Sequence, residues 1–458
     1  MTISTEELLE RLQRGSTTLW PVGNVAGSRL GWIESPKEME REANDLRRWA
    51  DTIDQEVVIL LGMGGSSLGT AVLSAFAESF GGLNGRRFVV CDTTEPSTVV
   101  AAPFEDAFIL VSSKSGTTLE PNVLFAYAMT RQRDPRRYAV ITDPGTPLAL
   151  DAKAKRVNRV FENRPDIGGR YSVLSYFGMV PAALLGYDVA ELAGRALEGD
   201  HHEAVDLGIR LGQAALEGRD KATILVEGKA RPFGLWVEQL IAESTGKLGR
   251  GIVPVPTDEP ESGEDREPVR VEFAAAHELG AAFYRFEIAT AIAGHVLDLD
   301  PFDEPNVAES KANTGRVLSD LPLPAQSPEQ PGSLAPFLED ELRPGDYVSI
   351  QAYLPYGSEA ELDQLRKKIR DNHGGIAVTA GYGPRFLHST GQLHKGGPNS
   401  VVAVQLVAHS PREQLAIPDK PYDFATLIEA QAIGDRESLR SHGRRVVTIA
   451  IDELTELL

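Results

Sequence analysis

Short apolar runs alternate with helix-like segments along the first third of the chain. Four runs predict buried strands: Glu56 to Leu61, Arg87 to Cys91, Ala107 to Ser112 and Tyr138 to Thr142. A helix-like segment follows each of them. This alternation predicts a parallel, doubly wound α/β sheet, and ligands of such sheets lie beyond the carboxyl ends of the strands.

The segments on either side set the predicted domain boundaries. Thr5 to Leu12 and Pro36 to Trp49 have the apolar spacing of helices that cover a core, so residues 1–50 are predicted to form an N-terminal helical segment. The strand and helix pattern then defines a first α/β domain over residues 51–205.

The pattern restarts in the second half and predicts a second α/β domain over residues 206–412. A helix is expected around Gly234 to Ser244, and strands at Ala222 to Glu227, Tyr347 to Tyr353, Gly375 to Val378 and Val401 to Val407. Two acidic, proline-rich stretches predict exposed loops: Pro254 to Pro268 and Leu321 to Pro336. Residues 413–458 predict a helix, the strand Arg445 to Ile451, and a short helix.

Composition narrows the kinds of partner. The 458 residues carry a formal net charge of −20 with no basic tract, which argues against nucleic-acid binding. The sequence has no signal peptide and no apolar run that could span a bilayer, so we expect a cytoplasmic protein that is not bound to membranes. Cys91 is the only cysteine, which excludes an intrachain disulfide and a thiolate-rich metal site.

A turn rich in hydroxyl groups lies between the strand that ends near Ser112 and the helix predicted from Asn122. It contains Ser113, Lys114, Ser115, Thr117 and Thr118. The free N–H groups and positive dipole end of the following helix make such a turn a suitable cradle for a phosphate. The alternative interpretation is a serine- and threonine-rich turn that merely caps the helix.

A glycine-rich turn, Gly62 to Gly69, follows the first strand. A dinucleotide fingerprint would need glycine at Ser67, and a Walker A loop would need lysine at Thr70. What remains is a turn that brings its backbone, with Gly65 and Ser66, close to a polar ligand.

Three further segments carry candidate chemistry. Arg170 follows two glycines, so its guanidinium could face an anion or a developing oxyanion. Gln239 and Glu243 are one helical turn apart, and a carboxylate at a helix end can be tuned for proton transfer. Lys311 lies in a helix that follows Asp300 to Pro305. Taken singly, Arg170, Glu243 and Lys311 are each better explained as a charge at the surface.

Taken in their order along the chain, the five segments resemble the glucose-6-phosphate isomerase family over about Val57 to Lys311. The motifs that carry the resemblance are Gly62-Met-Gly-Gly-Ser66, Ser113-Lys-Ser-Gly-Thr-Thr118, Gly168-Gly-Arg170, Gln239-x-x-x-Glu243-Ser-x-Gly-Lys247 and Pro301-Phe-Asp-x-x-x-Val-x-x-x-Lys311. The stretch Leu387 to Asn399 resembles the isomerase half of transaldolase–isomerase fusions. Because there is no upstream length for a transaldolase barrel, we expect a stand-alone isomerase.

The resemblance implies two sugar-isomerase (SIS) domains and a role for each residue. Ser113, Ser115, Thr117 and Thr118, with Lys114, Gly65 and Ser66, would bind the sugar phosphate. Glu243 would move a proton between C1 and C2, and Arg170 would stabilise the enediolate. Lys311 would assist ring opening, and Gln239 would orient the sugar. The resemblance implies no metal or other cofactor.

Two positions depart from the family pattern. Glu304 stands where the family usually has glutamine, so a carboxylate replaces a substrate-binding amide. The ring-opening histidine normally lies between the base and the lysine, but only His277 and His295 do so here, without the expected neighbours. We therefore expect His394 or His388 to open the ring, or to have a structural or phosphate-rim role. In this family that histidine can come from a neighbouring subunit, so a homodimer would be functional.

Other functions stay open at the level of sequence. The pocket could also isomerise mannose 6-phosphate, or the chain could be a sugar-phosphate sensor without catalysis. The combination of Glu243, Arg170 and Lys311 favours an enzyme. A nicotinamide-dependent dehydrogenase is disfavoured by Ser67, and Asp92 is its only candidate for binding a ribose. A separate transaldolase is a conceivable functional partner.

Overall fold

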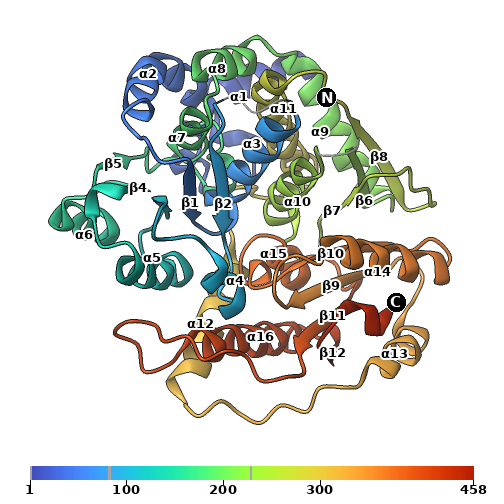
Figure 1. The fold of residues 1–458 in the computed structure, drawn as a ribbon. Coiled ribbons are helices and arrows are strands. Elements are labelled where there is room, and N and C mark those ends of the chain that lie inside the picture. The colour runs from blue at the N-terminus through green and yellow to red at the C-terminus, as the bar shows by residue number, and fades with distance from the viewer. Residues whose placement is uncertain (1–2, 81–83, 227–229) are drawn as a thin grey trace.

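The computed structural model describes residues 3–80, 84–226 and 230–458, and within these residues the strands form three parallel sheets. Figure 1 shows the elements from α1 to α11 in the upper part of the molecule and the elements from β9 to β12 in the lower part, with α12 descending between them. The structure confirms the predicted α/β class, with parallel sheets flanked by helices.

The first sheet has the strand order β2-β1-β3-β4-β5, with all neighbours parallel. Its strands are β1 (Val57–Leu61), β2 (Arg87–Cys91), β3 (Phe108–Ser112), β4 (Tyr138–Thr142) and β5 (Arg159–Glu162). The first four lie within one residue of their predicted bounds because each is an apolar run. Strand β5 was not predicted, since it is a four-residue edge strand with a mixed composition.

Helices connect and cover these strands. They are α3 (Leu68–Ser79), α4 (Pro96–Ala101), α5 (Leu119–Arg131), α6 (Pro147–Lys155) and α7 (Tyr176–Leu185). Two 3-10 turns, η4 (Gly64–Ser66) and η6 (Gly169–Tyr171), interrupt the connections where the site will be found.

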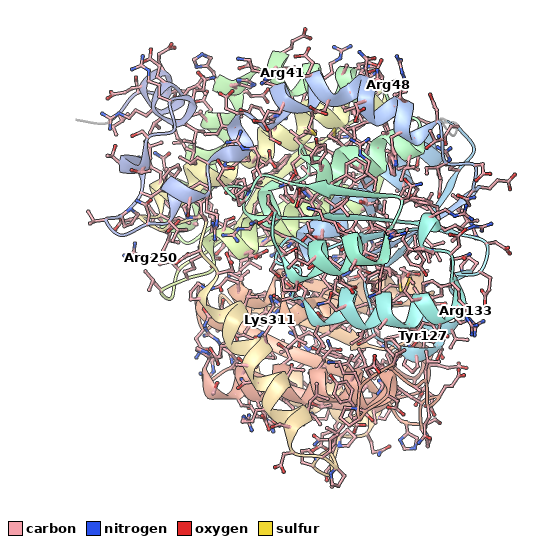
Figure 2. The ribbon with its side chains drawn as sticks, turned by 90° about the vertical axis from the view of Figure 1, so that its left-hand side faces the viewer. Arg41, Arg48, Tyr127, Arg133, Arg250 and Lys311 are labelled. Atoms are coloured by element: carbon pink, nitrogen blue, oxygen red, sulfur yellow. The ribbon has the colours of Figure 1, made fainter. Side chains whose placement is uncertain are left out.

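The predicted N-terminal helices are α1 (Thr5–Gln13) and α2 (Ser35–Ala50). They pack on a helical layer of α7, α8 (Val189–Glu198), α9 (His201–Leu216) and α11 (Leu279–Val296). Arg41 and Arg48 of α2 are exposed and lie on the outer surface in Figure 2, while Leu46 on the opposite face is fully buried. The charged and apolar faces therefore divide as the amphipathic pattern predicted.

The second half contains two sheets instead of one. The smaller has the order β7-β6-β8, with β6 (Lys221–Val226), β7 (Val253–Thr257) and β8 (Arg266–Val271). Glu227, the last residue of the strand predicted here, lies outside the described residues. Helix α10 (Arg231–Thr245) joins β6 to β7.

The prediction of an exposed loop over Pro254 to Pro268 is wrong at both of its ends. Pro254 and Pro256 lie in β7 and Pro268 lies in β8. Both are edge strands, and proline is tolerated at an edge because its missing N–H need not be donated to a neighbouring strand.

The larger sheet of the second half has the order β10-β9-β11-β12 and is entirely parallel. Its strands are β9 (Tyr347–Tyr353), β10 (Ala377–Tyr382), β11 (Val401–Ala408) and β12 (Arg445–Ile451), and its helices α12 (Pro305–Ser319), α13 (Leu334–Glu341), α14 (Glu359–Asn372), α15 (Gly391–Gly396) and α16 (Phe424–Ser441), followed by a 3-10 turn (Leu454–Leu457). Strand β12 pairs with β11, so residues 413–458 and 206–412 share a sheet. The domain boundaries themselves stay predictions.

The Leu321 to Pro336 stretch is largely exposed, as expected, but it is not wholly irregular. Glu329 pairs with Ile449 of β12, and α13 begins at Leu334.

Candidate active site

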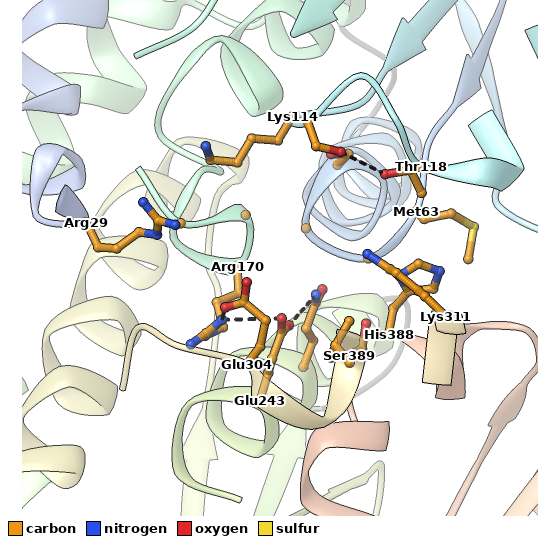
Figure 3. Close-up of a pocket in the computed structure, with 18 residues that line it drawn as sticks. Arg29, Met63, Lys114, Thr118, Arg170, Glu243, Glu304, Lys311, His388 and Ser389 are labelled. Atoms are coloured by element: carbon orange, nitrogen blue, oxygen red, sulfur yellow. Dashed lines mark hydrogen bonds and ion pairs between the residues drawn. The ribbon is translucent and has the colours of Figure 1, made fainter. Parts of the chain in front are cut away.

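One cavity of about 260 Å³ gathers side chains from the turns after β1 and β3, from η6, from α10 and α12, and from the segment after β10 (Figure 3). Its lining residues are Arg29, Met63, Gly64, Gly65, Ser66, Lys114, Ser115, Thr118, Gly168, Gly169, Arg170, Gln239, Glu243, Glu304, Val307, Lys311, His388 and Ser389. Every site residue predicted from the sequence lines it except Ser113, Thr117 and His394.

The hydroxyl-rich turn lies at the top of the cavity in Figure 3. Thr118 occupies the N-cap position of α5, yet its side chain makes no capping hydrogen bond and instead lies 3.4 Å from the Ser115 Oγ. The Thr118 hydroxyl therefore does not occupy the first N–H groups of α5. An anion site at this helix end requires such N–H groups as donors. Thr117 bonds to Ser115 Oγ from outside the cavity, and Ser113 is buried beneath the turn.

The cation of this turn is already paired. Lys114 forms an ion pair with the buried Asp143 and donates to the carbonyl of Pro165 at 3.2 Å. Burial raises the pKa of Asp143 above its usual value despite this contact. Binding of a phosphate at this turn would therefore depend mainly on hydroxyl and N–H donors.

The two glycine turns touch each other behind the cavity. A Cβ on Gly65 would lie 2.1 Å from the carbonyl oxygen of Gly169, so no side chain fits there. Gly64 has a φ of +54°, and a Cβ there would come within 2.9 Å of the Gln239 amide. Glycine is needed at both positions because backbone meets backbone and the amide.

Arg170 and Glu243 lie at the bottom of the cavity in Figure 3. The Arg170 side chain is 1% exposed; its Nη1 lies 3.3 Å from Glu243 Oε1 and 3.0 Å from Glu304 Oε2. Gln239 donates to the other oxygen of Glu243 at 2.9 Å, across one helical turn. Burial opposes the charge of Arg170, but the two carboxylates outweigh it and raise the pKa of Arg170. The base candidate is thus held beside a permanent cation.

The loop that carries Glu304 is held from below. Arg170 Nη2 donates to the carbonyls of Pro301 at 2.6 Å and Asp303 at 2.9 Å, and Lys247 donates to the Asp303 carbonyl at 2.6 Å. Burial disfavours the charge of Glu304, but Arg170 outweighs this effect and keeps the pKa of Glu304 below its usual value. The Glu304 carboxylate is therefore ionised and paired with Arg170.

His388 lies on the opposite side of the cavity, next to Lys311 in Figure 3. Its Nε2 is 3.1 Å from Oε1 of the buried Glu120, in the first turn of α5. Burial disfavours the charge of Glu120, but His388 and, more weakly, Lys311 lower the pKa of Glu120 overall. Sequence reasoning missed Glu120, although it closes the hydroxyl-rich segment.

The structure does not bring His394 to the cavity. It lies inside α15 with 2% exposure, stacked on Phe386 and 3.4 Å from Ser349 Oγ. Burial lowers its pKa to about 3. The expectation that His394 could reach the sugar is not supported, because its ring faces strand β9 in place of the site.

Arg29 is a lining residue that no motif predicted. It comes from the N-terminal segment, far from the other site residues in sequence, and a Cβ on Gly168 would contact its Cδ at 3.8 Å. Only the tertiary fold brings it to the cavity. Lys311, by contrast, was predicted; Figure 2 shows it on α12, where that helix passes from the upper to the lower part.

Asp92 does not line the cavity. It accepts hydrogen bonds from Arg385 and from the Tyr356 hydroxyl at 2.7 Å, which join the first sheet to the second half.

Across the described ranges, no cluster of three histidine, cysteine or acidic side chains is placed to hold a metal ion. None of the helices described has the length and apolar character needed to cross a membrane.

Comparison with known proteins points to one group of enzymes. No family model matches the sequence. The glucose-6-phosphate isomerase of Lactobacillus helveticus is 26% identical over 395 residues, covering 65% of this chain and 88% of that protein. That of Caldanaerobacter subterraneus subsp. tengcongensis is 29% identical over 287 residues, covering 55% and 63%.

A solved structure agrees in fold. The crystal structure of a glucose-6-phosphate isomerase from Chlamydia trachomatis matches with a TM-score of 0.50 and 18% identity, covering 71% of this chain and 80% of that chain. The chain thus resembles glucose-6-phosphate isomerases in sequence and shares the fold of one. Together these similarities support the class of sugar-phosphate isomerases.

Proposed function

We propose that this protein is a glucose-6-phosphate isomerase that interconverts glucose 6-phosphate and fructose 6-phosphate. The observation that carries the proposal is the meeting, in one cavity, of the hydroxyl-rich turn with Glu243 and Arg170. A sugar-phosphate sensor needs the turn but has no use for a carboxylate held 3.3 Å from a buried guanidinium.

The reaction begins with a cyclic sugar phosphate, whose phosphate is bound by Ser115, Thr118 and the N–H groups of the turn. His388, next to Lys311, opens the ring: it takes the proton from the C1 hydroxyl and gives a proton to the ring oxygen. We assign this step to His388 and not to His394, because His388 lines the cavity.

Glu243 then takes the proton from C2 of the open-chain aldose. That proton is acidic because the C1 carbonyl accepts the electrons and becomes an enediolate. Arg170 stabilises the negative oxygens, and Glu243 returns the proton to C1 to give the 2-ketose. Gln239 holds the Glu243 carboxylate between proton transfers.

The experiment is conversion of fructose 6-phosphate to glucose 6-phosphate by the full chain, run beside mannose 6-phosphate as a second substrate. We expect turnover of the first pair and proton exchange with solvent at C2. Binding of fructose 6-phosphate without turnover would instead support the sensor. Faster turnover of mannose 6-phosphate would show that the pocket selects the other C2 configuration.

A further inference from the structure

The Glu120 carboxylate beside His388 accepts a second hydrogen bond, from a distant part of the chain. Its Oε1 is 2.7 Å from the amide Nε2 of Gln431, as well as 3.1 Å from the ring nitrogen of His388. Gln431 is fully buried in α16, 311 residues further along the chain. One carboxylate oxygen therefore joins the site histidine to the C-terminal helix.

The amide of Gln431 is itself fixed from its other end. Its Oε1 accepts a hydrogen bond from the Thr94 hydroxyl at 2.5 Å, and Thr94 is fully buried at the carboxyl end of β2. A flipped amide would place its oxygen against the Glu120 carboxylate, which can only accept. The donor–acceptor order is thus Thr94 to Gln431 to Glu120.

The charge of Glu120 sets the tautomer of His388. Since the pKa of Glu120 is lowered, the carboxylate is ionised and His388 Nε2 must carry the proton that lies between them. The other ring nitrogen, Nδ1, makes no hydrogen bond to any residue the structure describes. It is the nitrogen left for a ligand in the cavity.

We propose that Gln431 and Thr94 are positioning residues for ring opening, acting through Glu120 on His388. The inference rests on the proposed function. Neither side chain lines the cavity, so neither contacts the sugar. Their task is to keep Glu120 ionised and aligned, and thereby to fix the tautomer and orientation of the imidazole.

The test measures ring opening directly, as the exchange rate between the two anomers of glucose 6-phosphate by exchange NMR, together with kcat and KM for isomerisation. The variants are Gln431→Leu and Thr94→Val, which remove each donor at similar volume. Gln405→Leu is the matched control: Gln405 is also a fully buried glutamine, on β11, but it donates to the Ala432 carbonyl and lies outside the hydrogen-bond series from Thr94 through Gln431 to Glu120.

We expect Gln431→Leu to reduce anomer exchange and kcat about tenfold with KM unchanged, and Thr94→Val to reduce them less. Gln405→Leu should leave both rates at the wild-type level even if it lowers the melting temperature. Wild-type exchange in Gln431→Leu, or an equal loss in Gln405→Leu, would overturn the proposal.

A second variant guards against a folding defect. Gln431→Glu places a carboxylate against Glu120, so it should move the acid limb of the kcat profile to higher pH. An unmoved acid limb would also overturn the proposal. If wild type neither isomerises sugar phosphates nor speeds anomer exchange, the proposed function fails instead, and the two failures are distinguishable.

Discussion

Two walls of the cavity each pair a carboxylate with a nitrogen-containing side chain, but they differ in which partner is buried and which faces the cavity. On one wall, Arg170 is buried and always charged, and two carboxylates, Glu243 and Glu304, share it. On the other, the carboxylate of Glu120 is buried and the titratable imidazole of His388 lines the cavity. The first wall presents a carboxylate to the ligand, and the second presents an imidazole.

The difference indicates a division of labour. A carboxylate can abstract a carbon-bound proton, and a fixed cation beside it can stabilise the negative charge that develops on the substrate oxygens. An imidazole with a buried carboxylate partner is suited to moving protons between oxygens near neutral pH. The walls should therefore fail separately when either is altered.

Among variants that leave Glu243 in place, the largest effect should come from removing the imidazole of His388. His388→Asn should lower isomerisation of cyclic glucose 6-phosphate about 100-fold, because ring opening loses its proton carrier. Anomer exchange should fall in parallel. Exchange at the wild-type rate would show that the second wall does not open the ring.

The hydroxyl-rich turn serves both walls, so altering it should weaken both steps alike. Ser115→Ala removes one phosphate donor and should raise KM about tenfold for both reactions with little change in kcat. Steady-state kinetics with inorganic phosphate as a competitor checks this. A fall in kcat alone would place Ser115 in the chemistry and not in binding.

Glu304→Gln sharpens the description of the first wall. With one carboxylate fewer, the guanidinium of Arg170 would interact more strongly with Glu243 and stabilise its ionised form. The acid limb of kcat should therefore move to lower pH, with kcat changed by only a few fold. An acid limb at higher pH would contradict the shared arrangement.

The smallest effect on activity is expected at the second histidine of the same segment. His394→Gln should leave kcat unchanged, because His394 lies in the core against β9. It should change acid stability: the pKa of His394 is lowered to about 3 in the folded state, so unfolding takes up a proton below its ordinary pKa of 6.5. Wild type should lose about 1.4 kcal/mol per pH unit from this group as pH falls from 6.5 to 3.

Denaturant unfolding at several pH values tests that sign. The variant should have a shallower decline than wild type below pH 6.5. An identical slope would contradict the lowered pKa of His394, and a loss of kcat at neutral pH would contradict its place in the core.

The sequence predicted the parts of the site that lie on single segments. Gln239 and Glu243 are one helical turn apart, and the hydroxyl-rich turn follows a clearly apolar strand, so local patterns suffice for both. The apolar runs likewise predicted β1 to β4. Strands β7 and β8 were missed because their prolines are compatible with a strand only at a sheet edge, which tertiary structure alone decides.

Other features depend on contacts between distant segments. His388 and His394 lie in one motif, and only the start of α15 after Thr390 directs one ring to the cavity and the other to the core. Arg29 and Gln431 reach the site region from opposite ends of the chain. No local pattern marks either residue, because each is defined by its neighbours in space.

The most direct test of the central claim is Glu243→Gln, with isomerisation and anomer exchange measured on the same sample. We predict that isomerisation falls at least 100-fold while the enzyme still speeds anomer exchange, because only the first wall is altered. Isomerisation at the wild-type rate would contradict the assignment of Glu243 as the base.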